Sequence, residues 1–124
     1  MATILIVEDT DNATPLEIAL SKLDGLETRV VSNGRDALAV LHSYSEDLAA
    51  IITDLHLPFV DGFEIVAAVR AHARYSKLPI VVVSGDNLPE SFNRVRRLGA
   101  NACFSKPYSP TEVRRTLEGL LHVS

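Results

Sequence analysis

The stretch at residues 49–58, AAIITDLHLP, constrains the fold more than any other part of the chain. Apolar residues run without polar alternation up to a threonine and then Asp54. This pattern is typical of a strand buried on both faces, as in a parallel sheet covered by helices. Asp54 then lies at the carboxyl end of that strand. Because ligands bind at this edge in open α/β sheets, we expect Asp54 to be the centre of the functional site.

The composition is that of an ordinary soluble domain. The 124 residues are 47% hydrophobic and 23% charged, which fits one domain. A formal net charge of −4 gives no reason to expect direct nucleic-acid binding. The apolar runs are too short to cross a membrane, and the N-terminus lacks the basic segment of a secretory signal. A single cysteine excludes an internal disulfide and suits a reducing compartment, so we expect a cytoplasmic protein.

Strand and helix patterns alternate along the sequence. The predicted strands cover residues 4–7, 28–31, 49–54, 79–84 and 102–105. The predicted helices open at residue 14 and at residue 109, and cover residues 35–43, 62–74 and 90–98. Such alternation favours a doubly wound five-stranded parallel sheet with five helices and right-handed crossovers.

Two segments carry the same helix-start signal. TPLE at residues 14–17 and SPTE at residues 109–112 each combine a hydroxyl N-cap, a proline at the first helical position and a capping-box glutamate. We therefore expect one helix to begin at Thr14-Pro15, after a polar loop at residues 9–13. The last helix is expected to begin at Ser109-Pro110.

Polar side chains stand at the ends of four predicted strands. Glu8 and Asp9 follow the first, Asp54 ends the third, Ser84 ends the fourth, and Lys106 follows the fifth. Carboxylates held close together resist ionisation unless a cation is present. Oxygen ligands of this kind suit Mg²⁺. A carboxylate nucleophile, a metal, a lysine and a hydroxyl are the parts needed for phosphoryl transfer.

Several short motifs, in order and at matching spacing, resemble the receiver domains of two-component response regulators. They are Glu8-Asp9, DLHLP at residues 54–58 with Asp61-Gly62, Ser84-Gly85, Gly99-Ala100 and Lys106-Pro107-Tyr108. The resemblance covers essentially the whole chain. It implies a flavodoxin-like fold with strand order 2-1-3-4-5, one of the common orders among doubly wound folds. It also leads us to expect one receiver domain over residues 1–124 with no output domain.

The resemblance implies a role for each site residue. Asp54 would accept a phosphoryl group from a histidine kinase or a histidine phosphotransferase. Lys106, in a cis peptide with Pro107, would pair with that group, and Ser84 would move toward it. The implied Mg²⁺ ligands are Asp9, Asp54 and the backbone carbonyl of His56, with Glu8 acting through water. The protein would then be a signalling switch that assists its own phosphorylation and dephosphorylation, and not a turnover enzyme.

One position departs from the family pattern. Three residues before the lysine, where these domains usually carry a tyrosine or phenylalanine switch, this chain has Cys103. Phe104 comes one place later and is expected on the opposite face, because side chains alternate along a strand. At this position the chain lacks the aromatic side chain on which the usual readout depends. The resemblance implies a downstream protein target bound through the face of the fourth helix, fifth strand and fifth helix.

Other functions remain open on the sequence alone. Haloacid-dehalogenase-like phosphatases also use an aspartate after a strand, but they carry Asp-x-Asp, and here the second acid is replaced by His56. A flavin carrier would need a phosphate loop after the first strand, where Glu8 and Asp9 repel phosphate. A degenerate receiver that binds partners without phosphorylation is the last alternative. The full set of acids with Lys106 argues against it.

Overall fold

The computed structural model describes residues 2–43, 47–86 and 88–121, and five parallel strands form the centre of this part of the chain. The strands are β1 (Ala2–Val7), β2 (Leu26–Val31), β3 (Leu48–Thr53), β4 (Ile80–Ser84) and β5 (Ala102–Ser105). They are ordered β2-β1-β3-β4-β5 and all pairings are parallel. The predicted fold class and strand order are confirmed.

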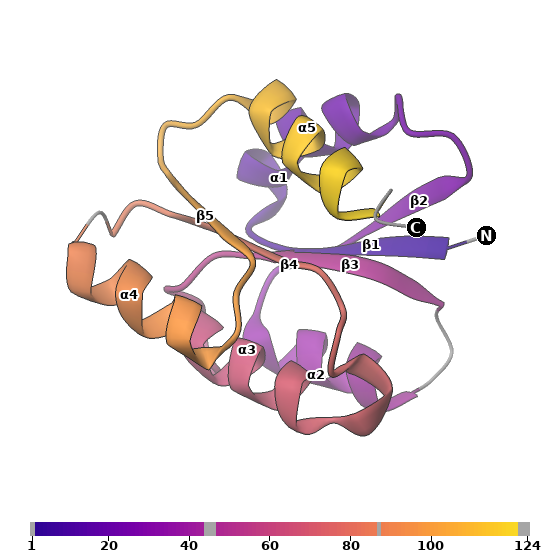
Figure 1. The fold of residues 1–124 in the computed structure, drawn as a ribbon. Helices are drawn as coiled ribbons and strands as arrows, with labels where there is room; N and C mark the ends of the chain where they lie inside the picture. Colours follow the sequence, from indigo (N-terminus) through magenta and orange to yellow (C-terminus); the bar gives the residue numbers. More distant parts are fainter. Residues whose placement is uncertain (1, 44–46, 87, 122–124) are drawn as a thin grey trace.

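Four α-helices of the described residues connect successive strands, and a fifth follows β5. They are α1 (Thr10–Leu20), α2 (Gly34–Ser43), α3 (Gly62–Ala71), α4 (Pro89–Leu98) and α5 (Pro110–Leu121), and a short 3-10 helix, η1 (Ala73–Tyr75), follows α3. Helices α1 and α5 cover one face of the sheet, and α2, α3 and α4 cover the other (Figure 1). No helix in the described ranges combines the length and the apolar character needed to cross a membrane.

The core consists of two apolar layers separated by the sheet. Alternate residues of β1 enter different layers: Ile4 and Ile6 pack under α1 and α5, while Leu5 and Val7 pack under α2, α3 and α4. This alternation is what a strand with period two produces. All of β4 is buried, which explains its unbroken apolar run.

The start of α1 differs from the prediction. The helix begins at Thr10, four residues before Thr14, and Pro15 lies inside it. The side chain of Asp9 accepts a hydrogen bond from the Asn12 amide at 3.0 Å and so caps the helix one turn earlier. The earlier start also buries Ala13 against the sheet. Capping and burial together outweigh the hydrogen bond that Pro15 removes.

Candidate functional site

Four polar groups meet at the carboxyl edge of the sheet. Glu8 follows β1, Asp54 follows β3, Ser84 ends β4, and Lys106 follows β5. The pairing register places β1, β3, β4 and β5 side by side. The strand order therefore brings these residues to one edge of the sheet, as the sequence predicts.

Asp54 is held at the end of β3 by two kinds of contact. Its Oδ1 accepts hydrogen bonds from the backbone N–H groups of Leu55 at 2.6 Å and His56 at 3.3 Å. Its Oδ2 accepts a hydrogen bond from Lys106 Nζ at 2.8 Å. The residue is 8% exposed, so the carboxylate is fixed in position and still open on one side.

Lys106 joins the two buried carboxylates. Its Nζ lies 2.6 Å from Glu8 Oε2 and 2.8 Å from Asp54 Oδ2. The ion pair with Glu8 was not anticipated from the sequence, which placed Lys106 only beside the phosphoryl group. The charge argument could have found it, because a buried carboxylate needs a partner and Lys106 is the cation at this edge.

The electrostatics of the site follow from burial and from this shared lysine. Burial raises the pKa of Glu8, and the charge of Asp54 raises it further, while the hydrogen bond from Lys106 opposes the shift. Burial works against the charge of Lys106, but its hydrogen bonds to Asp54 and Glu8 hold the pKa of that ammonium group above its usual range. Two acids around one fixed cation make a site that attracts a further positive charge.

Asp9 lies beside this group and serves as the N-cap of α1. Its Oδ1 accepts from the Asn12 amide at 3.0 Å and its Oδ2 accepts from Asn12 Nδ2 at 2.7 Å. Both oxygens thus face the first turn of α1. Each of these oxygens accepts one hydrogen bond from Asn12 and keeps a further lone pair that a cation could use.

The donor set at this edge fits a hard divalent cation. It contains the carboxylates of Glu8, Asp9 and Asp54 and the backbone carbonyl that follows them at His56, and all of these are oxygen donors of the kind that Mg²⁺ prefers. Within the described residues, no group of three or more histidine, cysteine or acidic side chains is already gathered around one point. The structure therefore shows suitable donors that are not collected into a closed metal cage.

Ser84 and the Lys106-Pro107 peptide complete the edge. Ser84 is fully buried, and its Oγ accepts a hydrogen bond from the Asp86 amide at 3.1 Å. Its carbonyl accepts from the Lys106 amide at 2.8 Å, which ties β4 to the segment that carries the lysine. The Lys106-Pro107 bond is cis, in agreement with the expectation.

The side chain of His56 makes a contact that the sequence did not reveal. Its Nε2 lies 3.0 Å from Asp86 Oδ2, with the imidazole 64% exposed and the Asp86 side chain 14% exposed. Asp86 played no part in the sequence reasoning. One signal was available: an aspartate shortly before the first turn of a helix often accepts backbone hydrogen bonds, and here Oδ1 accepts from the Leu88 amide at 3.1 Å.

Cys103 and Phe104 lie on opposite faces of β5. Cys103 packs against the layer that contains α4, and Phe104 packs against the layer that contains α1 and α5. The predicted alternation is confirmed. Strand β5 therefore offers a half-buried thiol, and not an aromatic ring, on the face toward α4.

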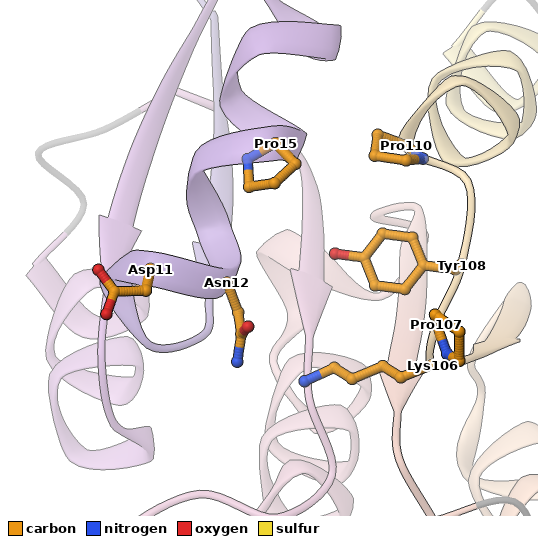
Figure 2. Close-up of a pocket in the computed structure, with 7 residues that line it drawn as sticks. All are labelled: Asp11, Asn12, Pro15, Lys106, Pro107, Tyr108 and Pro110. Atoms are coloured by element: carbon orange, nitrogen blue, oxygen red, sulfur yellow. The ribbon is translucent and has the colours of Figure 1, made fainter.

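A pocket of about 460 Å³ adjoins Lys106. Figure 2 shows it between the first half of α1 and the segment that leads into α5, with the Tyr108 hydroxyl pointing toward α1. Burial raises the pKa of Tyr108, and the charge of Glu8 adds to the shift, so this hydroxyl stays neutral and can donate a hydrogen bond. The lining residues are Asp11, Asn12, Pro15, Lys106, Pro107, Tyr108 and Pro110.

Comparison with known proteins agrees with this geometry. The family model described as "Response regulator receiver domain" matches residues 4–118. The two-component response regulator ORR11 of Oryza sativa subsp. indica is 27% identical over 118 residues, which cover 95% of this chain and 80% of the relative.

Solved structures show the same similarity. The chemotaxis response regulator CheY4 of Vibrio cholerae is 30% identical with a TM-score of 0.83, covering 98% of this chain and 99% of that one. The receiver domain of the sensor histidine kinase PA1611 of Pseudomonas aeruginosa is 27% identical with a TM-score of 0.79, covering 97% of each chain. In that receiver domain a magnesium ion is coordinated in the active-site cleft.

Proposed function

The chain belongs to the response regulator receiver domain family, and from this we propose that it is a phosphorylation-dependent switch in which Asp54 accepts a phosphoryl group from a phosphohistidine. The observation that carries the proposal is the ion-paired carboxylate at the carboxyl edge of the sheet, with Asp54 Oδ2 2.8 Å from Lys106 Nζ. Asp54 is a fixed nucleophile, and Lys106 is a cation placed where phosphoryl charge would develop.

The transfer is a single displacement at phosphorus. A carboxylate oxygen of Asp54 forms the new bond to phosphorus while the bond from phosphorus to the imidazole nitrogen breaks. The electron pair of that bond leaves with the imidazole, which remains on the donor protein. The backbone N–H groups of Leu55 and His56, which hold Oδ1, keep the carboxylate oriented throughout.

Lys106 and Ser84 have distinct tasks in this proposal. Lys106 would exchange part of its contact with Asp54 and Glu8 for a contact with a phosphoryl oxygen. Because the pKa of Lys106 is raised, its ammonium group stays charged and can pair with that oxygen. The buried hydroxyl of Ser84 would supply a hydrogen-bond donor to the same group. Asp9, Asp54 and the His56 carbonyl would hold Mg²⁺, with Glu8 acting through water. When bound, the ion would neutralise phosphoryl charge.

Two partners follow from the proposal. One is a sensor histidine kinase or a histidine phosphotransferase that brings the phosphohistidine to Asp54. The other is a downstream protein bound at the face of α4, β5 and α5. Exposed arginines on α4, Arg96 and Arg97, support a target with an acidic surface there.

The test is phosphorylation by a small donor. With Mg²⁺ and acetyl phosphate, we expect intact-mass measurement to show the gain of one phosphoryl group by the wild-type protein and none by Asp54→Asn. Chelation of the metal should remove the gain as well. The matched control is Asp24→Asn, an exposed acid in the turn before β2, which should be phosphorylated like the wild type. Full phosphorylation of Asp54→Asn would refute the assignment of the acceptor.

A further inference from the structure

Asp86 connects the phosphoryl site to the first turn of α4. Its Oδ2 accepts a hydrogen bond from Ser91 Oγ at 2.7 Å and contacts His56 Nε2 at 3.0 Å. Its Oδ1 accepts from the Leu88 amide at 3.1 Å. One carboxylate thus contacts the segment after β3 and the beginning of α4 at the same time.

The backbone of Asp86 makes a second connection to the site. Its N–H donates to the buried Oγ of Ser84 at 3.1 Å. On the other side, the His56 amide donates to Asp54 Oδ1 at 3.3 Å. Asp86 therefore contacts Ser84 at the end of β4 and, through His56, lies one residue away from the acceptor.

The Asp86 carboxylate contacts the start of helix α4. The N-cap residue is Leu88, whose side chain makes no capping hydrogen bond. Asp86 accepts from the Leu88 amide and from Ser91 Oγ instead. A carboxylate near a helix N-terminus is also favoured by the helix dipole. The hydrogen bonds from Ser91, Leu88 and His56 lower the pKa of Asp86, so the group is charged in this arrangement.

The usual connection between a receiver site and α4 is missing on β5. Cys103 lies on the face toward α4, and a thiol has neither the volume nor the polar tip of a tyrosine. The Asp86 contacts join the same two regions by another route.

We propose that Asp86 is a positioning residue that couples the phosphoryl state of Asp54 to the first turn of α4. This inference rests on the proposed function. If Ser84 Oγ turns toward a phosphoryl oxygen, the Asp86 amide loses its acceptor. A ligand changes an equilibrium only through its differential contacts with the two states, and here the contact that differs is the one between Ser84 and Asp86. Loss of that contact releases the hold of Asp86 on Ser91 and Leu88, and α4 responds.

The experiment follows backbone amide signals by NMR, with beryllofluoride and Mg²⁺ as the phosphoryl mimic. The Leu55 amide reports on the acceptor, and the Val95 and Leu98 amides report on α4. In the wild type all three should shift when the mimic binds. In Ser91→Ala, Leu55 should shift as in the wild type, and the two α4 amides should shift by less than half as much.

Matched variants separate coupling from general damage. Glu90→Gln changes the exposed neighbour of Ser91 in α4 and should behave as the wild type does. Ser91→Thr keeps a hydroxyl and should restore the response of α4. Asp86→Ala removes the carboxylate itself and should abolish that response even if it also loosens the helix. If beryllofluoride binding breaks the contact between Asp86 and Ser91, that contact also weakens beryllofluoride binding. Ser91→Ala lacks the contact and should therefore bind beryllofluoride about fivefold more tightly than the wild type.

The outcomes distinguish this inference from the function on which it rests. If Leu55 does not respond in the wild type, the proposed acceptor is wrong and the coupling is refuted with it. If Leu55 responds, but Val95 and Leu98 shift equally in the wild type, Ser91→Ala and Asp86→Ala, the acceptor stands and the role of Asp86 is refuted. An α4 that fails to respond in the wild type also refutes the coupling.

Discussion

The two ends of the proposed signalling path in this molecule are built differently. At the acceptor end, defined by Glu8, Asp54 and Lys106, the lysine lies in direct contact with both carboxylates and the side chains are mostly buried. The readout end is defined by Cys103 and α4. It contains a half-buried thiol and a group of side-chain hydrogen bonds centred on Asp86. The acceptor end keeps the residues that carry the resemblance to the family, and the readout end departs from the pattern at Cys103.

The difference has a physical reason. Phosphoryl transfer needs a nucleophile, a cation and oxygen donors at fixed distances, because developing charge is stabilised only by groups already in place. A readout needs only that two arrangements of a packed region differ in free energy. Many side-chain combinations meet the second requirement, and few meet the first.

The largest effect that we predict breaks the acceptor end through its backbone. In Gly62→Ala the added Cβ would overlap the carbonyl oxygen of Asp54 and lie 2.7 Å from Leu55 Cα. Both are backbone atoms, so the segment that holds the acceptor must move. We expect a loss of about 3 kcal/mol of stability in urea unfolding, and much slower phosphorylation by acetyl phosphate.

A second glycine provides the control for that experiment. Apart from its chain neighbours and the nearby backbone of α5 itself, Gly119 has no atom within 4 Å of an added Cβ. Gly119→Ala should therefore raise the stability by about 0.5–1 kcal/mol, because alanine favours a helix. It should leave phosphorylation unchanged. Equal stabilities for the two variants would contradict the close approach of Gly62 to the acceptor segment.

The next prediction concerns the charge of Glu8. Its pKa is raised by burial, so the folded state holds that proton more tightly than the unfolded state does. The stabilising contribution is then complete below the ordinary pKa of a glutamate and is lost as the pH rises through the folded pKa. In Glu8→Gln this loss disappears. We expect the variant to gain stability relative to the wild type as the pH rises above the ordinary pKa of a glutamate, reaching roughly 1 kcal/mol.

Thermal unfolding in the presence of a chelator measures this effect without a metal. Glu27→Gln, at an exposed position of β2, is the matched control and should show no such gain. The same Glu8→Gln protein should respond less to added Mg²⁺, since it lacks one acidic oxygen donor. A wild-type stability that rises through this pH range relative to Glu8→Gln would reverse the sign and contradict the buried-charge interpretation.

The sequence predicted the acceptor end better than the readout end, because strand patterns can be recognised in a sequence and side-chain hydrogen bonds between distant segments cannot. Asp54 and Lys106 follow apolar runs that are recognisable as buried strands, and parallel strands bring their carboxyl ends to one edge. The Asp86 network joins exposed segments through side-chain hydrogen bonds, and no periodicity encodes such contacts. His56, separated from Asp86 by 30 positions, carried no signal of this partner.

The start of α1 was predicted wrongly because local signals competed. Thr14-Pro15 has the chemistry of a helix start, and Asp9 has it too. The choice depended on tertiary burial of Ala13 and Leu16 against the sheet, which is not a local property. The motif at Ser109-Pro110 had no such competitor, and α5 begins there as predicted, with Ser109 Oγ accepting from the Glu112 amide at 3.3 Å.

The smallest effect that we predict tests whether the two ends are separable. Burial raises the pKa of the Cys103 thiol, against the opposing charge of Arg96, so at pH 7 the group is neutral and acts as a small apolar side chain. Cys103→Val keeps a similar volume and suits a strand. It should change the free energy of unfolding by less than about 1 kcal/mol and leave the rate of phosphorylation by acetyl phosphate unchanged.

Two further measurements make that comparison decisive. Alkylation of Cys103 by a neutral maleimide should be much slower in the native protein than in urea, because only the thiolate reacts and burial disfavours it. Phe104→Leu, on the same strand and the opposite face, is the control and should cost more stability than Cys103→Val, because it removes an aromatic ring from an apolar layer. If Cys103→Val slows phosphorylation tenfold or more, the thiol takes part in the chemistry at Asp54. The acceptor end and the readout end would then have to be treated as one site, because the residue at position 103 would affect both phosphorylation and the response of α4.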